Sequence, residues 1–355
     1  METTATTAQI RNIYLYIWVL LFFTGCQDPK RESLYKKQYF IFGTIIDVLI
    51  WHNDDSLVNK ALNKVELELN AMHHQWHAWK AGRLSEINQQ LYDGKTVKLT
   101  DEEAQFINTT KQLSIQSMGY FNPAIGELIN LWGFHTDAYP ITEPPPEDSE
   151  ILAFLQDLPT MNDVHIRNNT ISSSNQHLRL DYGGVAKGYA IDKAINILKS
   201  HGIKNAIVNA GGDLRSIGSK GDKDWKVAIR KPNSDQIMAV IAVNGDESIF
   251  TSGNYERYKE FNGTRYAHII DPQTGYGVKD IVSATVIVSE NDNDGTKADA
   301  AATALIVAGS NNWQKVAQSM HLDQILLIDA KGTCMATQKI IARLEKTELE
   351  CSILL

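Results

Sequence analysis

Short apolar runs separated by turn residues fill the chain from Asn162 onward, and this alternation limits the folds open to it. Two helical segments interrupt the runs, at 185–200 before Gly202 and at 296–308 before Gly309, and glycine commonly follows the last turn of a helix. Because several strands follow one another as hairpins, the order favours an α+β fold with mixed or antiparallel sheets and flanking helices over a doubly wound parallel sheet. The predicted strands are 163–167, 170–173, 177–181, 204–209, 213–217, 225–230, 237–244 and 281–288.

The first half of the chain contains longer elements. The segment "YFIFGTIIDVLIW" at 39–51 is apolar and β-branched, which predicts one buried strand interrupted by Gly43. A helix follows with Ser56 as its cap, and "TDEE" at 100–103 is a capping box for a second helix that runs to about Ser117. The proline-rich stretch 139–150 predicts a surface excursion.

The N-terminal segment carries signals of export. An apolar run at 13–23 is too short to span a bilayer but suits a signal peptide. It ends in "FFTGC", which is similar to a bacterial lipobox and predicts that Cys26 is lipidated and becomes the first mature residue. An uncleaved anchor and a wrongly assigned start are the alternatives. The predicted organisation is a signal peptide at 1–25, a tether at 26–38, one folded domain at 39–340 and a C-terminal tail at 341–355.

The charge balance excludes one class of partner. The 355 residues carry a formal net charge of −8 and no run rich in Lys or Arg, so we expect no binding to nucleic acid. A phosphorylated ligand would be held by local groups or by a cation, because the overall field repels it. Hydrophobic residues make up 43% of the chain, enough for a core that needs no disulfide framework. Whether Cys334 and Cys351 pair is left open.

The alanine-rich stretch "ADAAATA" at 298–304 places a carboxylate and a hydroxyl on one face of a helix. Asp299 and Thr303 stand one turn apart there. One explanation of this pair is a helix cap, in which Thr296 is the N-cap and Asp299 completes a capping box.

Two Gly-Gly turns add candidate anion-binding groups. The segment "LDYGGVAKGYAID" at 180–192 runs through such a turn into a helix that begins near Lys187, where free N–H groups and a cation can face a phosphate. The alternative is a structural turn with a solvated lysine. The second turn, "NAGGD", has Asp213 beside it, and "FTSGNYERY" holds Ser252 without a nucleophile motif.

The remaining candidates are His268 and the aromatic segments. His268 lies in an apolar run before a proline-containing turn, where a core histidine and a catalytic one are both plausible. The aromatic residues of 76–88 and 119–134 suit a flat heterocycle, although a buried core explains them as well.

Taken in order, these segments resemble the ApbE-type flavin transferases (FAD:protein FMN transferases). The resemblance covers about Phe42 to Gly309 and rests on eight elements in register. The two most specific are "HIIDPQTG" and "DYGGVAKGYAID". The other six are "FGT", "SEIN", "GYFNPAIGELINLWGF", "NAGGD", "TSGNYERY" and "ADAAATA".

The resemblance implies an exported, lipid-anchored enzyme on the periplasmic face of the inner membrane. Such an enzyme binds FAD with Mg²⁺, joins FMN to a threonine or serine hydroxyl of an acceptor protein, such as a subunit of a membrane redox complex, and releases AMP. It also implies a metal site formed by the Gly184 carbonyl, Asp299 and Thr303, with His268 accepting the hydroxyl proton or orienting the phosphate. The implied FAD contacts are Phe42, Trp79, Tyr120, Phe121, Asn122, Asp181, Lys187 and His268.

Two positions depart from the family pattern, and two other functions compete with transfer. Asn122 stands where an aspartate is common, and Trp79 stands where a tyrosine is common. An FAD pyrophosphatase that gives FMN and AMP would use the same site. A non-catalytic flavin-binding lipoprotein is the third hypothesis, and the presence of Asp299 and Thr303 disfavours it.

Overall fold

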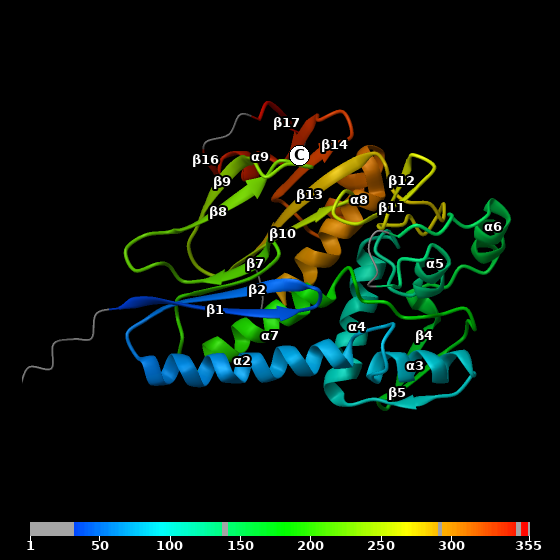
Figure 1. Ribbon diagram of the computed structural model, residues 1–355, viewed down its shortest axis with the longest axis horizontal. Coiled ribbons are helices and arrows are strands. Elements are labelled where there is room, and N and C mark those ends of the chain that lie inside the picture. Colours follow the sequence, from blue (N-terminus) through cyan, green and yellow to red (C-terminus); the bar gives the residue numbers. More distant parts are fainter. Residues whose placement is uncertain (1–31, 137–140, 290–292, 346–348, 354–355) are drawn as a thin grey trace, which may run out of the picture.

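The computed structural model describes residues 32–136, 141–289, 293–345 and 349–353. Figure 1 shows strands and helices in separate layers, as an α+β fold requires. The elements are, in chain order, β1 (Ser33–Ile41), β2 (Thr44–His52), α2 (Asp55–Gln75), α3 (Arg83–Tyr92), β3 (Val97–Lys98), α4 (Asp101–Gln116), α5 (Gly126–Leu131), α6 (Asp148–Gln156), η1 (Met161–Asp163), β4 (Val164–Arg167), β5 (Thr170–Ser173), α7 (Ala186–Ser200), β6 (Ala206–Ala210), β7 (Asp213–Ile217), β8 (Trp225–Arg230), β9 (Ile237–Val243), β10 (Glu247–Gly253), β11 (Tyr258–Phe261), β12 (Thr264–Ala267), β13 (Ile281–Val288), α8 (Asp294–Ser319), β14 (Ile325–Asp329), β15 (Cys334–Ala336), α9 (Gln338–Ile341), β16 (Leu344–Glu345) and β17 (Cys351–Ile353).

A nine-stranded sheet forms the centre of the molecule (Figure 1). Its strand order is β1-β2-β6-β7-β10-β13-β14-β15-β17, and every pair is antiparallel except β15 with β17. Smaller sheets pair β16-β9-β8, β3-β5-β4 and β11-β12. This mixed but mainly antiparallel arrangement confirms the predicted fold class.

The two faces of the central sheet enclose two cores. Alternate side chains of a strand point to opposite faces, so Val208 of β6 packs in the core beneath helices α2, α7 and α8, while its neighbour Ile207 packs under the β8–β9 pair. Helices α7 and α8 therefore lie against one face of the strands β6, β7, β10 and β13 (Figure 1). This packing places the start of α7 and the first half of α8 beside the strands that carry "NAGGD" and "TSG".

The predicted single strand at 39–51 is wrong, because it is a hairpin. β1 begins at Ser33 and pairs with β2 along its whole length, with Phe42 and Gly43 in the turn at φ values of 56° and 71°. Positive φ at both central residues is the type I′ hairpin geometry. The predicted tether 26–38 and the predicted boundary at residue 39 are therefore wrong from Ser33 onward.

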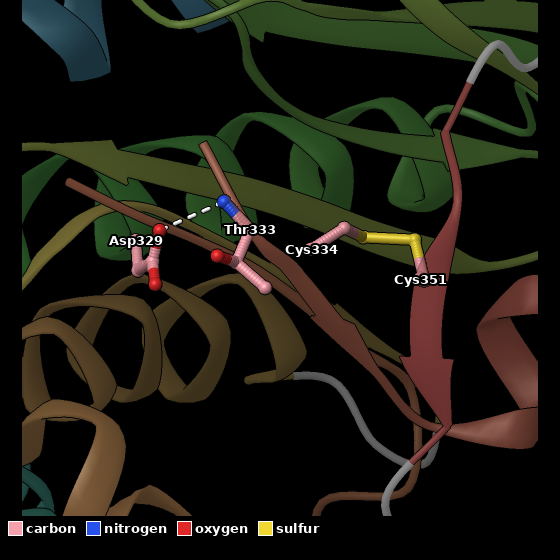
Figure 2. Close-up of a disulfide and its surroundings, with 4 residues drawn as sticks. All are labelled: Asp329, Thr333, Cys334 and Cys351. Carbon is pink, nitrogen blue, oxygen red and sulfur yellow. Dashed lines mark hydrogen bonds between the residues drawn. A yellow bond between two sulfur atoms is a disulfide. The ribbon is translucent and has the colours of Figure 1, made fainter. Parts of the chain in front are cut away.

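The C-terminal segment predicted as a tail also belongs to the fold. β17 adds to the central sheet beside β15, and a disulfide joins Cys334 to Cys351 with a Cα–Cα distance of 4.5 Å. Figure 2 shows the disulfide linking the two strands, near the turn in which Asp329 accepts a hydrogen bond from the backbone N–H of Thr333. Cys334 is 2% exposed and belongs to the core under the β8–β9 pair, so the disulfide bond lies at the side of that core.

Three further expectations need correction. Residues 177–181 form no strand, and only Arg179 makes an isolated bridge, to Ile125. The helix after residue 52 is capped by Asp54, whose carboxylate accepts hydrogen bonds from two backbone N–H groups of the first turn. The helix at 296–308 begins earlier, at Asp294, and after a kink at Gly309 it continues to Ser319.

Candidate active site

A Gly-Gly turn leads directly into helix α7 and sets the position of Lys187. The Asp181 carboxylate accepts a hydrogen bond of 2.8 Å from the backbone N–H of Gly183, which is the local bond that favours a turn at this point. Helix α7 begins at Ala186, so Lys187 lies in its first turn, as predicted. A cation and the N-terminus of a helix are thus brought together.

Helix α8 approaches this turn closely, because glycine lies at the contact. A Cβ on Gly188 would overlap the carbonyl oxygen of Gly295, so no larger residue fits there without moving one helix. The Asp299 carboxylate uses this approach to accept a hydrogen bond of 2.9 Å from the backbone N–H of Gly188. Asp299 therefore caps α7 and not its own helix, and the capping-box alternative with Thr296 as N-cap is wrong.

Thr303 lies one turn farther along α8 and faces the Gly-Gly turn. A Cβ built on Gly184 would be 3.2 Å from the Thr303 hydroxyl oxygen and 3.6 Å from the Phe121 ring. The same hydroxyl is 3.4 Å from the hydroxyl of Ser252 on β10. The structure thus brings Gly184, Asp299 and Thr303 together from two segments that are distant in the sequence.

Lys187 forms an ion pair with Asp213 at the start of β7. Asp213 is 4% exposed at its side chain and also accepts a hydrogen bond of 2.9 Å from the backbone N–H of Thr251, whereas 30% of the Lys187 side chain is exposed. The solvated-lysine alternative is therefore wrong, although one side of Lys187 remains accessible to a ligand. We call Lys187, Asp213, Asp299 and Thr303 the site cluster.

The site cluster holds more negative than positive charge. Burial raises the pKa of Asp299 to about 7, and the carboxylates of Asp213 and Glu256 add to this effect against the opposing charge of Lys187 and the hydrogen bond from Gly188. Burial alone would lower the pKa of Lys187, but the surrounding carboxylates outweigh it and raise that pKa. An added cation would relieve this imbalance.

His268 is held as a neutral imidazole beside the site cluster. Burial lowers its pKa to about 4, opposed by the hydrogen bond to the Arg257 carbonyl, and the charges of Arg257 and Lys187 lower it further. Its Nδ1 lies 2.8 Å from that carbonyl oxygen. A neutral ring that donates through Nδ1 leaves Nε2 as an acceptor. His268 therefore has the protonation state of a general base.

The predicted flavin contacts fall into separate groups. Trp79 donates a hydrogen bond of 2.7 Å to Asp181, which ties an indole ring to the Gly-Gly turn. Phe42 lies in the β1–β2 turn and packs its ring edge-on to His73.

The other predicted contacts follow α4. Tyr120 is half-buried against the main core, Phe121 is buried beside Gly184, and the Asn122 side chain bonds to the Pro159 carbonyl and the Ala124 backbone N–H. Asn122 thus has two partners inside the protein, which gives it a structural role whatever it contacts in addition.

Two carboxylates of the site had weaker signals in the sequence. In the sequence, Asp213 stands out only as a neighbour of a Gly-Gly turn, and Glu256 carries no signal of its own. Each lies at or just after a motif near the end of a short strand: Asp213 ends "NAGGD", and Glu256 comes shortly after "TSGN". Asp213 pairs with Lys187 and the charge of Glu256 acts on it only because the fold brings the three residues together, which no local pattern predicts.

The wider surroundings add three observations. Within the described residues no three His, Cys, Asp or Glu side chains converge as metal ligands. A cavity of about 630 Å³ lies along α2, α4 and α7, lined among others by Glu102, Tyr189 and Lys193, and includes none of the site cluster. No helix in the described part of the chain is long and apolar enough to cross a membrane.

Comparison with known proteins places this arrangement in a family. The model of the ApbE family matches residues 42–326. A Rhodobacter capsulatus protein named FAD:protein FMN transferase is 36% identical over 310 residues, covering 87% of this chain. The chain spans only 58% of the length of that relative. A Vibrio cholerae protein of the same name is 29% identical over 324 residues, covering 90% of this chain and 94% of its own length.

Solved structures agree with the sequence matches. The ApbE protein of Thermotoga maritima superposes with a TM-score of 0.78 at 27% identity, covering 88% of this chain and 100% of that one. The flavin transferase ApbE of Vibrio cholerae superposes with a TM-score of 0.76 at 26% identity, covering 88% and 100%. With the family model matching most of its length and the fold matching as well, this chain belongs to the ApbE family.

Proposed function

We propose that this chain transfers the FMN moiety of FAD to a threonine or serine hydroxyl of an acceptor protein, with Mg²⁺ bound and AMP released. The convergence of Gly184, Lys187, Asp299 and Thr303 carries the proposal, because it joins one cation to a set of oxygen ligands. Relatives that match most of this chain are named FAD:protein FMN transferase, which supports the same reaction.

The residues present fit a magnesium ion. Magnesium prefers hard oxygen ligands and usually takes only one or two carboxylates from the protein, with substrate phosphates completing its shell. Asp299 would supply the carboxylate, Thr303 the hydroxyl and Gly184 a backbone carbonyl. The raised pKa of Asp299 supports this assignment, because a carboxylate that is costly to ionise in isolation gains from a neighbouring cation. When bound, the ion neutralises charge on the pyrophosphate.

Lys187 and His268 would act on opposite partners of the reaction. Lys187 has an exposed side at the N-terminus of α7 and would pair with a phosphate of FAD. His268 would accept the proton of the acceptor hydroxyl at Nε2 as the new oxygen–phosphorus bond to FMN forms. The bond between the two phosphates of FAD then breaks, and AMP leaves with the electron pair.

We also propose that the protein is exported and lipid-anchored at Cys26, on the periplasmic face of the inner membrane. Cys26 lies outside the described residues, so the support comes from the "FFTGC" sequence. The Cys334–Cys351 disulfide supports export independently, since disulfides persist in oxidising compartments. Changing Cys26 to Ser should release the protein from membranes, and a variant that still sediments with them would contradict the anchor.

The reaction itself is tested by incubating the protein with FAD, Mg²⁺ and an acceptor domain that presents an exposed threonine. Transfer predicts flavin fluorescence on the acceptor band of a denaturing gel and release of AMP. A matched acceptor with valine in place of the threonine should stay dark. Free FMN with an unlabelled acceptor would instead identify a pyrophosphatase, and bound but uncleaved FAD would identify a flavin-binding protein.

A further inference from the structure

A second polar cluster lies on the same three elements as the site cluster, but inside the protein. Asp192 of α7, Arg215 of β7 and Thr296 of α8 are 1%, 0% and 1% exposed. With Asp246, which follows β9 and whose side chain is 37% exposed, and with Lys199 of α7, they form what we call the buried cluster. Side chains this polar are seldom buried unless every polar atom has a partner.

The Asp192 carboxylate caps helix α8 from the side of α7. One of its oxygens accepts hydrogen bonds of 2.9 Å from the Gly295 N–H and 2.6 Å from Arg215, and the other accepts 2.7 Å and 2.6 Å from the Thr296 N–H and hydroxyl. Gly295 and Thr296 belong to the first turn of α8, whose N–H groups have no partner within the helix. An acid at this end also suits the helix dipole.

Arg215 connects this cap to the sheet. It forms two hydrogen bonds with Asp246, at 2.7 Å and 3.0 Å, in addition to the one with Asp192. Asp246 also pairs with Lys199 of α7 at 2.6 Å. Two carboxylates therefore meet two cations, and the buried cluster joins α7, α8, β7 and the turn before β10.

The two clusters are coupled because each of α7, α8 and β7 carries residues of both. Asp213 and Arg215 are two residues apart on β7, so their side chains share one face of the strand. Thr296 and Asp299 lie one turn apart on α8. Helix α7 carries Lys187 of the site cluster in its first turn and Asp192 of the buried cluster farther along. Any shift of α8 against α7 that broke the Asp192 cap would also move Asp299 and Thr303 away from the Gly-Gly turn.

We propose that Asp192 and Thr296 are positioning residues for the metal site, because their contact fixes where α8 starts relative to α7 and so where Asp299 and Thr303 lie. In this role neither residue is itself a metal ligand, and both act through the position of α8. The inference rests on the proposed magnesium-dependent function.

The test is to bind Mn²⁺, as a spectroscopic substitute for Mg²⁺, to the FAD-loaded protein and to measure free Mn²⁺ by electron paramagnetic resonance. Thr296→Val keeps the side-chain shape and removes only the hydroxyl bond to Asp192. Its Mn²⁺ affinity should fall roughly 10-fold, which is the lower end of the loss seen when direct partners of metal ligands are removed, because Thr296 acts on the ligands only through the position of α8. Thr296→Ser restores the hydroxyl and should recover most of the affinity, while FAD binding without metal should be unchanged in both variants.

Thr110→Val is the matched control. Thr110 is also a fully buried helical threonine, with its hydroxyl bonded to the Ile107 carbonyl at 2.9 Å rather than to Asp192. It should lower the melting temperature about as much as Thr296→Val and leave Mn²⁺ affinity unaltered.

The possible failures differ. If wild-type protein binds Mn²⁺ and Thr296→Val binds it equally well, the buried cluster stabilises the fold without positioning the ligands, and the inference is overturned. If folded wild-type protein loaded with FAD binds no Mn²⁺, the proposed metal site is wrong, and the inference falls with it.

Discussion

The site cluster and the buried cluster use the same three elements but balance their charge differently. In the buried cluster two carboxylates meet two cations, and both oxygens of Asp192 are bonded. In the site cluster Lys187 faces Asp213 and Asp299 with Glu256 nearby, and the pKa of Asp299 rises to about 7. The buried cluster, whose charges balance, helps to hold the fold together. The site cluster, whose carboxylates outnumber its cations, is suited to receive a cation.

The difference also explains how α7 and α8 can hold the unbalanced charges of the site cluster in place. Removing one partner of a buried ion pair is costly because an uncompensated charge stays behind. When Asp299 is ionised and no metal is bound, the site cluster has more carboxylates than cations, so its geometry depends on neighbours whose polar groups are all hydrogen-bonded. The buried cluster and the close contact of Gly188 with Gly295 supply that support.

The largest effect is expected for Asp299→Asn. The change removes the only carboxylate among the proposed metal ligands, so FMN transfer should fall at least roughly 1,000-fold, more than the loss typical of a partner outside the ligand shell. Asp329→Asn is the control, because Asp329 accepts backbone bonds in a distant turn, and it should leave the rate of transfer unchanged. Comparable rates for the two variants would remove the distinction between the clusters.

The buried cluster should instead lose stability. Arg215→Met leaves Asp192 and Asp246 without their shared cation, and we expect a loss of about 3–5 kcal/mol in the free energy of unfolding. Lys226→Met breaks the exposed pair with Glu345 and should cost no more than about 1 kcal/mol. Urea unfolding measures both. Equal losses would show that the buried cluster is no part of the framework.

The disulfide tests whether stability and activity are separable. Replacing both Cys334 and Cys351 by Ala opens a link with a sequence separation of 17 residues, which should cost about 3 kcal/mol of stability. The rate of transfer at a temperature where the variant is folded should not change, because β15 and β17 lie at the far edge of the sheet from β7. A parallel loss of transfer would mean that any destabilisation disturbs the site.

The effect that is smallest per unit of change is a slope of stability with pH in the absence of metal. The pKa of Asp299 is about 7 in the folded protein and about 4 for an unfolded aspartate, so the folded state retains the proton between these values. Stability contributed by this proton is complete below about pH 4 and is lost as the pH rises through 7, by at most about 1.4 kcal/mol per pH unit. Asp299→Asn should flatten the curve of unfolding free energy against pH, and an unchanged slope would contradict the assignment.

Local patterns in the sequence were sufficient for many of the helices and strands. The periodicity and terminal glycine of 185–200 correctly predicted α7, and most short strands after residue 162 lie where alternation predicted them. The same rules failed where pairing is nonlocal. The hairpin at 33–52 has the composition of one long strand, and β17 is recognisable only through its partner β15.

The site shows the same limit at the level of single residues. The spacing of Thr296 and Asp299 is that of a capping box, yet both side chains bond to α7, at Asp192 and Gly188. Tertiary contacts override the local rule because the paired glycines bring the two helices together. The motifs therefore predicted several residues that the fold brings together, but not which partner each one takes.

The central claim is that the site cluster, in which carboxylates outnumber cations, holds the divalent cation used in flavin transfer. Calorimetric titration of Mg²⁺ into FAD-saturated protein tests it most directly, with wild type, Asp299→Asn and Thr303→Val compared under the same conditions. The account predicts saturable binding by wild type, a weaker affinity for Thr303→Val and no measurable binding for Asp299→Asn, while FAD alone binds all three. Equal Mg²⁺ affinities in the three proteins would contradict it.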